Sequence, residues 1–134
     1  MKALIYEGPG KMSYTEDLEV RDPEQGEVLV RIVASGICHS DISVLSGAIP
    51  WPAPAVLGHE GAGVIEKVGP GVTKLQPGDH VALHTLANCG QCAYCSQGRP
   101  THCRSTLGNR AQPFTLYGQP IANFAATSTF VEKT

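Results

Sequence analysis

Four of the five cysteines in this 134-residue chain lie in one short segment, with the spacing Cys89-x₂-Cys92-x₂-Cys95-x₇-Cys103. Four thiolates at this spacing suit a closed tetrahedral zinc site, which leaves no coordination position for a substrate. Two disulfides are one alternative, but no secretory signal precedes the segment, and reducing compartments favour a metal. An iron–sulfur cluster is another, although the x₇ interval and the absence of a following proline differ from the ferredoxin pattern. We therefore predict a structural-zinc lobe over residues 89–103.

The lobe contains few apolar residues, so bound metal would supply the energy that orders it. Arg99, Arg104 and Arg110 lie within or just beyond it and would offset the negative charge of zinc with four thiolates. His102 is a possible substitute ligand, and an exposed histidine is the alternative interpretation.

Outside the lobe, apolar runs alternate with turns that draw on 15 glycines and 10 prolines. The pattern predicts strands over residues 2–6, 27–34, 61–68 and 80–86, and a strand over 125–131 that no turn closes. The near-continuous apolar run at 28–33 indicates burial on both faces. A short helix is expected over 40–47, capped by Ser40 or Asp41, and residues 49–58 are expected to form a proline-rich loop. These short strands predict an all-β barrel or sandwich.

Charge and hydropathy exclude two classes of function. The net charge of −2 is wrong for a strong electrostatic binder of nucleic acid. No apolar run approaches the ~20 residues of a transmembrane helix. With no secretory signal in the sequence, we expect a cytoplasmic protein without nucleic-acid or membrane partners.

Two further segments carry residues that bind metals in other proteins, GICHSD at 36–41 and GHEGAG at 58–63. Taken alone, Cys38 fits a buried structural thiol and His59 fits a core histidine. The glycine-rich run lacks the lysine of a P-loop and the strand–helix context of a dinucleotide-binding turn. Neither segment identifies a function by itself.

The order Cys-x-Ser-Asp, Gly-His-Glu-Gly-x-Gly-x-Ile and four-cysteine lobe resembles the zinc-dependent medium-chain alcohol dehydrogenases over nearly the whole chain. The resemblance implies a mainly β, GroES-like, partly open barrel with a short helix and a cysteine-rich zinc lobe. It also implies that Cys38 and His59 bind a catalytic zinc. The structural zinc would be held by Cys89, Cys92, Cys95 and Cys103.

The resemblance gives roles to four more residues. Asp41 would accept a hydrogen bond from His59 and Glu60 would lie near the zinc, whereas a helix cap or a surface charge is the alternative for each. Ser40 would relay the proton of the alcohol, or merely cap the helix. His39 would face the cofactor pyrophosphate, or be simply exposed. Ser43 replaces a histidine that ends the relay in many relatives.

The resemblance further implies a third zinc ligand and a Rossmann cofactor domain beyond residue 134, so we expect residues 1–134 to be an incomplete catalytic domain. The full-length enzyme, a homo-oligomer, would transfer hydride between a small alcohol or aldehyde, or an aldehyde–thiol adduct, and NAD or NADP. These 134 residues alone would be inactive. The alternative is a non-catalytic, zinc-stabilised GroES-like module for binding or assembly, in which Cys38 and His59 need not converge.

Overall fold

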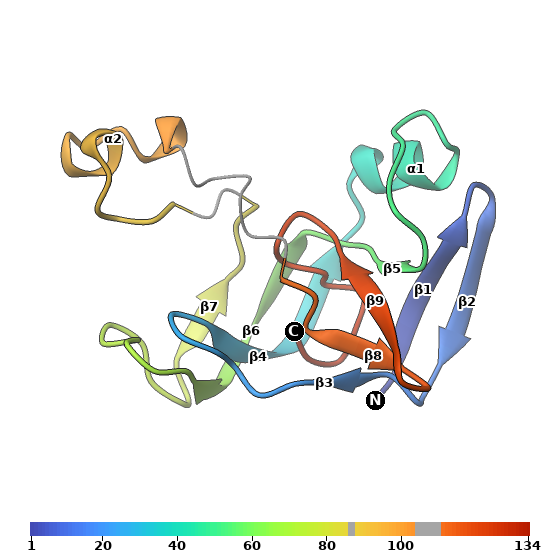
Figure 1. Ribbon diagram of the computed structural model, residues 1–134, viewed down its shortest axis with the longest axis horizontal. Helices are drawn as coiled ribbons and strands as arrows, with labels where there is room; N and C mark the ends of the chain where they lie inside the picture. The colour runs from blue at the N-terminus through green and yellow to red at the C-terminus, as the bar shows by residue number, and fades with distance from the viewer. Residues whose placement is uncertain (86–87, 104–110) are drawn as a thin grey trace.

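The computed structural model describes residues 1–85, 88–103 and 111–134. Within them the chain forms two β-sheets, and its short helices lie at one end of the molecule (Figure 1). The strands are β1 (Ala3–Gly8), β2 (Lys11–Thr15), β3 (Glu19–Val20), β4 (Val28–Gly36), β5 (Ala55–Val56), β6 (Glu60–Val68), β7 (His80–Ala82), β8 (Phe114–Leu116) and β9 (Gln119–Asn123). The helices are α1 (His39–Leu45), α2 (Ala93–Ser96) and the 3₁₀ helix η1 (Pro100–His102). This is the predicted mainly β fold with a short helix and a cysteine-rich lobe.

The larger sheet has the strand order β2-β1-β5-β9-β8-β3. Its neighbours are antiparallel except β5 and β9, which run parallel although about 65 residues of sequence separate them. Strand β1 begins one residue later than predicted. The sequence did not predict β2, β3, β8 or β9. The predicted loop over 49–58 contains β5, because Ala55 and Val56 pair with both β1 and β9.

The smaller sheet has the order β4-β6-β7. Gly63 pairs with Ile32 on β4, and a Cβ atom on Gly63 would overlap the carbonyl oxygen of the neighbouring Arg31, which explains the glycine. The prediction that residues 28–33 are buried on both faces is wrong, because Val33 lies at a bulge and is 65% exposed. Strand β7 ends at Ala82, earlier than predicted, and Leu86 lies outside the described residues.

The predicted strand over 125–131 is also wrong. Ala125, Ala126 and Ser128 have φ values of 53°, 57° and 51°, which are incompatible with an extended strand. In the described residues, β-pairing near the end of this segment is limited to isolated bridges at Val131 and Lys133, with no continuous ladder. The turn is held by the buried hydroxyl of Ser128, which accepts a hydrogen bond from the Phe124 amide at 2.8 Å and donates one to the Val56 carbonyl at 2.9 Å.

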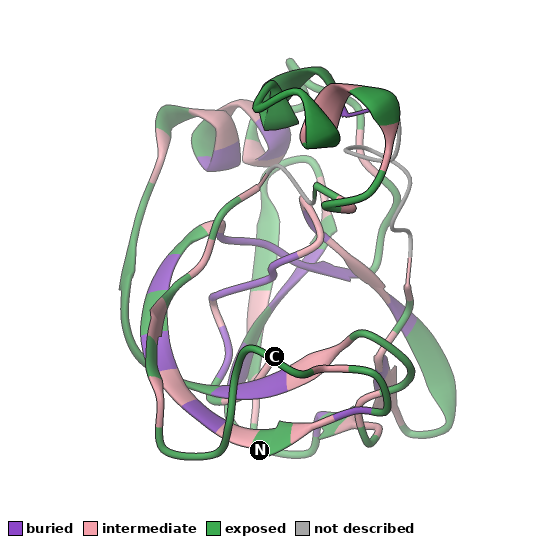
Figure 2. Ribbon diagram, turned by 90° about the vertical axis from the view of Figure 1, so that its left-hand side faces the viewer, coloured by how far each residue is buried: buried purple, intermediate pink, exposed green. Residues whose placement is uncertain are grey.

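Two apolar clusters form the interior, and Figure 2 shows the buried segments concentrated in the sheets rather than in the lobe. One cluster lies inside the curved larger sheet, around Phe114, Ile5 and Ile121. The other lies between that sheet and α1, around Tyr6 and Val44. Phe130 packs against both clusters. Among the described residues, no helix has the length and hydropathy needed to span a membrane.

Candidate metal centres

The first candidate metal centre lies where the end of β4 meets the start of β6. Gly36, the last residue of β4, pairs with Glu60, the first residue of β6. Cys38 follows β4 as the N-cap of α1, and His59 precedes β6. One ligand atom from each of Cys38, His59 and Glu60 lies within 4.8 Å of the other two. The sheet register therefore brings together two motifs that are about 20 residues apart in the sequence.

This donor set fits a zinc ion. Zinc accepts thiolate, imidazole and carboxylate ligands at about 2.0–2.3 Å, so ligand atoms around one ion lie roughly 3–4 Å apart. Cys38 and His59 are half-buried, whereas Glu60 is exposed. Three donors that are open to solvent on one side are the arrangement of a site that can accept a further ligand.

Asp41 joins the two halves of this centre. Its carboxylate is 3% exposed and accepts hydrogen bonds from the backbone amides of Cys38 and Gly58, each at 3.0 Å. A carboxylate oxygen also lies 3.4 Å from Nδ1 of His59, although this buried nitrogen makes no hydrogen bond. Asp41 thus fixes the backbone next to both expected ligands and faces the ring nitrogen that points away from Ser40.

Helix α1 carries the other residues that the sequence analysis selected. It begins at His39 with Cys38 as N-cap, so Ser40 is not the cap, and Asp41 acts from the third helical position of a capping box. Ser40 Oγ lies 3.3 Å from Nε2 of His59. The side chain of His39 is exposed. Ser43 donates a hydrogen bond to the His39 carbonyl at 3.0 Å and therefore does not point at the centre.

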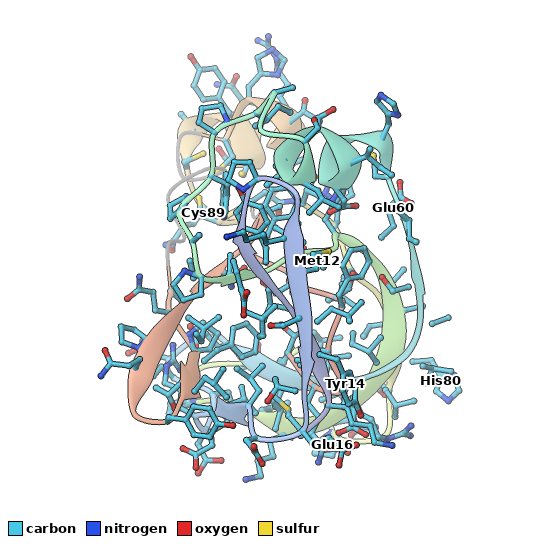
Figure 3. The ribbon with its side chains drawn as sticks, turned by 90° about the vertical axis from the view of Figure 1, so that its right-hand side faces the viewer. Met12, Tyr14, Glu16, Glu60, His80 and Cys89 are labelled. Carbon is cyan, nitrogen blue, oxygen red and sulfur yellow. The ribbon has the colours of Figure 1, made fainter. Side chains whose placement is uncertain are left out.

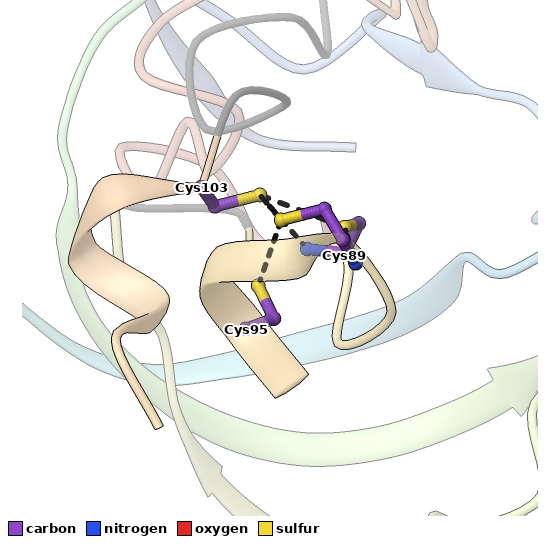
Figure 4. A group of neighbouring side chains, drawn as sticks. Cys89, Cys95 and Cys103 are labelled. Carbon is purple, nitrogen blue, oxygen red and sulfur yellow. Dashed lines mark hydrogen bonds between the residues drawn. The ribbon is translucent and has the colours of Figure 1, made fainter. Parts of the chain in front are cut away.

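The second candidate centre is the four-cysteine lobe (Figure 4). The Sγ–Sγ distances are 3.6 Å for Cys92–Cys95, 3.9 Å for Cys92–Cys103 and 3.6 Å for Cys89–Cys103. Four thiolates bound tetrahedrally at about 2.3 Å would lie roughly 3.8 Å apart, far more than the ~2.05 Å of a disulfide. The sulfur positions therefore fit one tetrahedral ion.

Backbone amides support negative charge in the lobe. The amide of Cys92 donates to Sγ of Cys89 at 3.3 Å, and the amide of Cys89 donates to Sγ of Cys103 at 3.4 Å. The amide of Cys95 lowers the pKa of Cys92, whereas removal from water and the Cys92 thiol raise the pKa of Cys95 to about 12.

His102 does not replace a cysteine in this set. Its ring lies tilted beside that of Tyr94, with centroids 6.0 Å apart, and its Nε2 is 3.5 Å from Arg99, whose guanidinium lies over Tyr94. Arg104 and Arg110 lie outside the described residues. Figure 3 shows Cys89 and Glu60, one from each centre, toward the same end of the molecule.

Comparison with known proteins shows the family to which the fold belongs. The family model described as "Alcohol dehydrogenase GroES-like domain" matches residues 24–132. The chain belongs to this family. A curated relative, the S-(hydroxymethyl)glutathione dehydrogenase of Escherichia coli O1:K1, is 41% identical over 142 residues. That alignment covers 99% of this chain and 38% of the relative, so this GroES-like chain spans well under half of the relative's length.

Solved structures give the same result for the GroES-like fold. An alcohol dehydrogenase zinc-binding domain protein from Burkholderia ambifaria matches with a TM-score of 0.88 and 40% identity, over 98% of this chain and 38% of that one. Benzyl alcohol dehydrogenase from Acinetobacter calcoaceticus matches with a TM-score of 0.81 and 36% identity, over 98% of this chain and 37% of that one.

The structure adds residues that sequence reasoning missed. Phe124 packs edge-on against Trp51, with ring centroids 4.8 Å apart, and against His59 at 5.5 Å. Gly58 has a φ of 88°, and a Cβ there would approach Thr129 Oγ1 to 2.5 Å. Glycine at position 58 therefore satisfies both the backbone conformation and the space before His59. No local pattern could connect Phe124 to His59, because the contact is long-range.

A cavity of about 330 Å³ opens between the two sheets of the GroES-like fold. Its walls include Leu29, Val81 and Leu83, with Arg21 and Glu27 also contributing. None of the selected ligand residues lines it, so we do not assign a substrate to this cavity.

Proposed function

We propose that this chain supplies the catalytic-domain portion of a zinc-dependent alcohol dehydrogenase. The full-length enzyme would transfer hydride between a small alcohol or aldehyde, or an aldehyde–thiol adduct, and NAD or NADP. The observation that carries the proposal is the convergence of Cys38, His59 and Glu60 within 4.8 Å, beside a separate four-cysteine set. The names of the relatives, S-(hydroxymethyl)glutathione dehydrogenase and benzyl alcohol dehydrogenase, support the same reaction type.

Each centre would hold one zinc ion. Cys38 and His59 would hold the catalytic ion, with Glu60 in reach, and the four cysteines would hold the structural ion. A catalytic zinc would supply the Lewis acidity that lowers the pKa of an alcohol hydroxyl to a workable range.

The side chains around the first centre would handle orientation and protons. Asp41, through its amide contacts at Cys38 and Gly58, would keep the two ligand-bearing segments in register and favour a proton on Nδ1 of His59. The Ser40 hydroxyl, 3.3 Å from the other ring nitrogen, would accept the substrate proton and pass it outward. His39, exposed beside it, would meet the cofactor pyrophosphate.

Binding of NAD or NADP, and assembly into a homo-oligomer, would depend on polypeptide other than these 134 residues. The curated relatives are longer than this chain, and residues 1–134 contain no strand–G-x-G-x-x-G–helix motif for a dinucleotide. A non-catalytic GroES-like module would not require Cys38, Ser40, Asp41 and His59 to converge, and their proximity favours the enzyme.

Zinc stoichiometry per chain, with alkylation of accessible thiols in parallel, tests the two centres. We expect one tightly held zinc that Cys103→Ser releases, and a second, weaker site that Cys38→Ser or His59→Ala removes. Cys38 should be alkylated readily when only the first ion is bound. A second zinc site that survives both Cys38→Ser and His59→Ala would contradict the catalytic assignment.

Hydride transfer itself is tested by exchanging this chain for the matching segment of the Escherichia coli relative, since that segment is 41% identical. The chimera should oxidise an alcohol or a hydroxymethyl thiol adduct with NAD or NADP, and Cys38→Ser should abolish this. A folded, zinc-loaded chimera with no such activity would count against the proposed reaction.

A further inference from the structure

Gly36 faces the carboxylate of Glu60 across the β4–β6 pair. The two residues are register partners at the ends of their strands. A Cβ atom built on Gly36 would lie 2.6 Å from Oε2 of Glu60, 3.3 Å from its Cβ and 3.6 Å from its Cδ. The carboxylate therefore occupies the space that a side chain at position 36 would take.

Backbone conformation does not explain this glycine. Gly36 does not have the left-handed φ that marks Gly58 and nine other glycines in the described chain. An alanine could adopt the same backbone at position 36 without strain. The space that the absent side chain leaves is therefore the property that distinguishes glycine from alanine here.

Glu60 has little else to hold its carboxylate in place. The residue is exposed, and in the described parts of the chain its side chain has no hydrogen bond and no ion pair. A free glutamate side chain samples several rotamers, and ordering it costs conformational entropy. Contact with the bare backbone at Gly36 is the restraint that the structure offers.

We propose that Gly36 is a positioning residue for Glu60, which keeps the carboxylate within reach of Cys38 and His59. The inference rests on the proposed metal centre and deepens it. An added methyl group would meet most closely the far end of a flexible side chain, and the Glu60 Cβ at 3.3 Å would need to give by only a few tenths of an ångström, so the carboxylate would move while the strands stay paired. Gly36→Ala should therefore change the centre without changing the stability of the fold.

A double-mutant cycle tests this on the 134-residue chain with its four-cysteine site first loaded with zinc. Co²⁺ is then titrated, and the visible absorption of its thiolate complex reports binding at Cys38. Because loss of a residue that orients a ligand typically weakens metal binding 10–100-fold, we expect Gly36→Ala and Glu60→Ala each to weaken Co²⁺ binding about tenfold. The double variant should bind no more weakly than Glu60→Ala alone.

Three controls separate positioning from damage to the fold. Gly36→Ala should keep the thermal midpoint and the zinc of the four-cysteine site. Val33→Ala, an exposed change on the same strand, should leave Co²⁺ binding as it is. A lower thermal midpoint in Gly36→Ala would instead mean that the glycine serves the fold, and would overturn the proposal.

Three other results would contradict the proposed role of Gly36. Gly36 does not act through Glu60 if Gly36→Ala binds Co²⁺ as tightly as the unmodified chain does. The same holds if the double variant loses as much Co²⁺ affinity as the two single variants lose together. If the unmodified chain binds no Co²⁺ at Cys38, then Cys38, His59 and Glu60 do not hold a metal ion by themselves, and this inference fails, whereas a third ligand outside residues 1–134 could still complete the proposed centre.

Discussion

Asp41 is the only acidic or basic side chain that is fully buried in the described residues, at 3% exposure. A buried carboxylate is costly unless hydrogen bonds replace its water, and here two backbone amides do so. Exposed ion pairs such as Lys67–Asp22 gain little by comparison, because water screens them and their side chains lose entropy. At the scale of single residues, burial decides which polar contacts contribute to stability.

Removing the Asp41 carboxylate should strongly destabilise the fold. Asp41→Ala leaves the amides of Cys38 and Gly58 without an acceptor, so we expect the free energy of unfolding to fall by about 3 kcal/mol. Urea denaturation measures this change. Ser43→Ala, which removes an exposed hydroxyl from the same helix, should cost less than about 0.5 kcal/mol. Equal losses in the two variants would show that Asp41 does not join the two segments.

Glu27 should make the free energy of unfolding depend on pH in the acid range. Arg21 donates to both carboxylate oxygens at 2.6 and 3.0 Å and lowers the pKa of Glu27 below its ordinary value of 4.5, although partial burial opposes this. The contribution is therefore fully present above pH 4.5 and is lost as the pH falls through the lowered pKa. Glu27→Gln should cost about 1 kcal/mol at neutral pH.

The free energies of unfolding of Glu27→Gln and of the unmodified chain, measured in urea, should converge as the pH falls through the lowered pKa of Glu27, because both side chains are neutral below it. Asp22→Asn, which breaks the exposed pair with Lys67, should leave stability unchanged at either pH. A difference between Glu27→Gln and the unmodified chain that persists in acid would contradict the assigned cause.

The elements differ in what holds them together. Strands β1, β5 and β9 share a buried apolar cluster, whereas in the described residues 88–103 only Cys103 is buried. Burial of apolar area therefore stabilises the sheets, and the lobe depends on its four sulfur atoms and the ion that they would bind.

Chelation of the proposed structural zinc should therefore unfold the lobe before the sheets. We expect backbone amides of residues 89–103 to lose protection from hydrogen exchange, while those of β1 keep it. Cys103→Ser should reproduce the effect, and Cys38→Ser, which removes a sulfur outside the lobe, should not. Protection of the lobe that persists after complete zinc removal would show that packing alone holds it.

The last residues of the chain join the two sheets. The amide of Glu132 donates to the Lys2 carbonyl next to β1 at 3.1 Å, and its carbonyl accepts from Ile32 on β4 at 2.9 Å. Val30 and Thr134 exchange two backbone hydrogen bonds at 2.7 and 2.9 Å. The segment Val131–Thr134 thus bonds to both sheets at once and restrains one relative to the other.

Deleting Val131–Thr134 should lower the free energy of unfolding by about 4 kcal/mol, since four backbone hydrogen bonds and the burial of Val131 are lost. Thermal unfolding measures the loss. Lys133→Ala, which removes only an ion pair with Glu66, should change stability by about 0.5 kcal/mol or less. If the truncated chain keeps its midpoint, the segment does not couple the sheets.

The sequence determined the features that arise from neighbouring residues. The spacing of four cysteines predicted the lobe, because ligands so close in sequence can meet around one ion with little help from the rest of the chain. The turn residues and apolar runs predicted β1, β4 and β6 and helix α1 within a few residues. The types of ligand at Cys38 and His59 were also evident, but only the resemblance of whole motifs to a known family joined them.

Only the tertiary structure decided which distant residues meet. It paired β5 with β9, turned residues 125–131 away from a strand, and placed Phe124 against His59. It also gave Asp41 its partner at Gly58 and placed the Glu60 carboxylate over Gly36. Each of these contacts depends on sheet register and on burial shared between remote segments. Local periodicity does not encode such contacts, because they exist only once the chain has closed around its core.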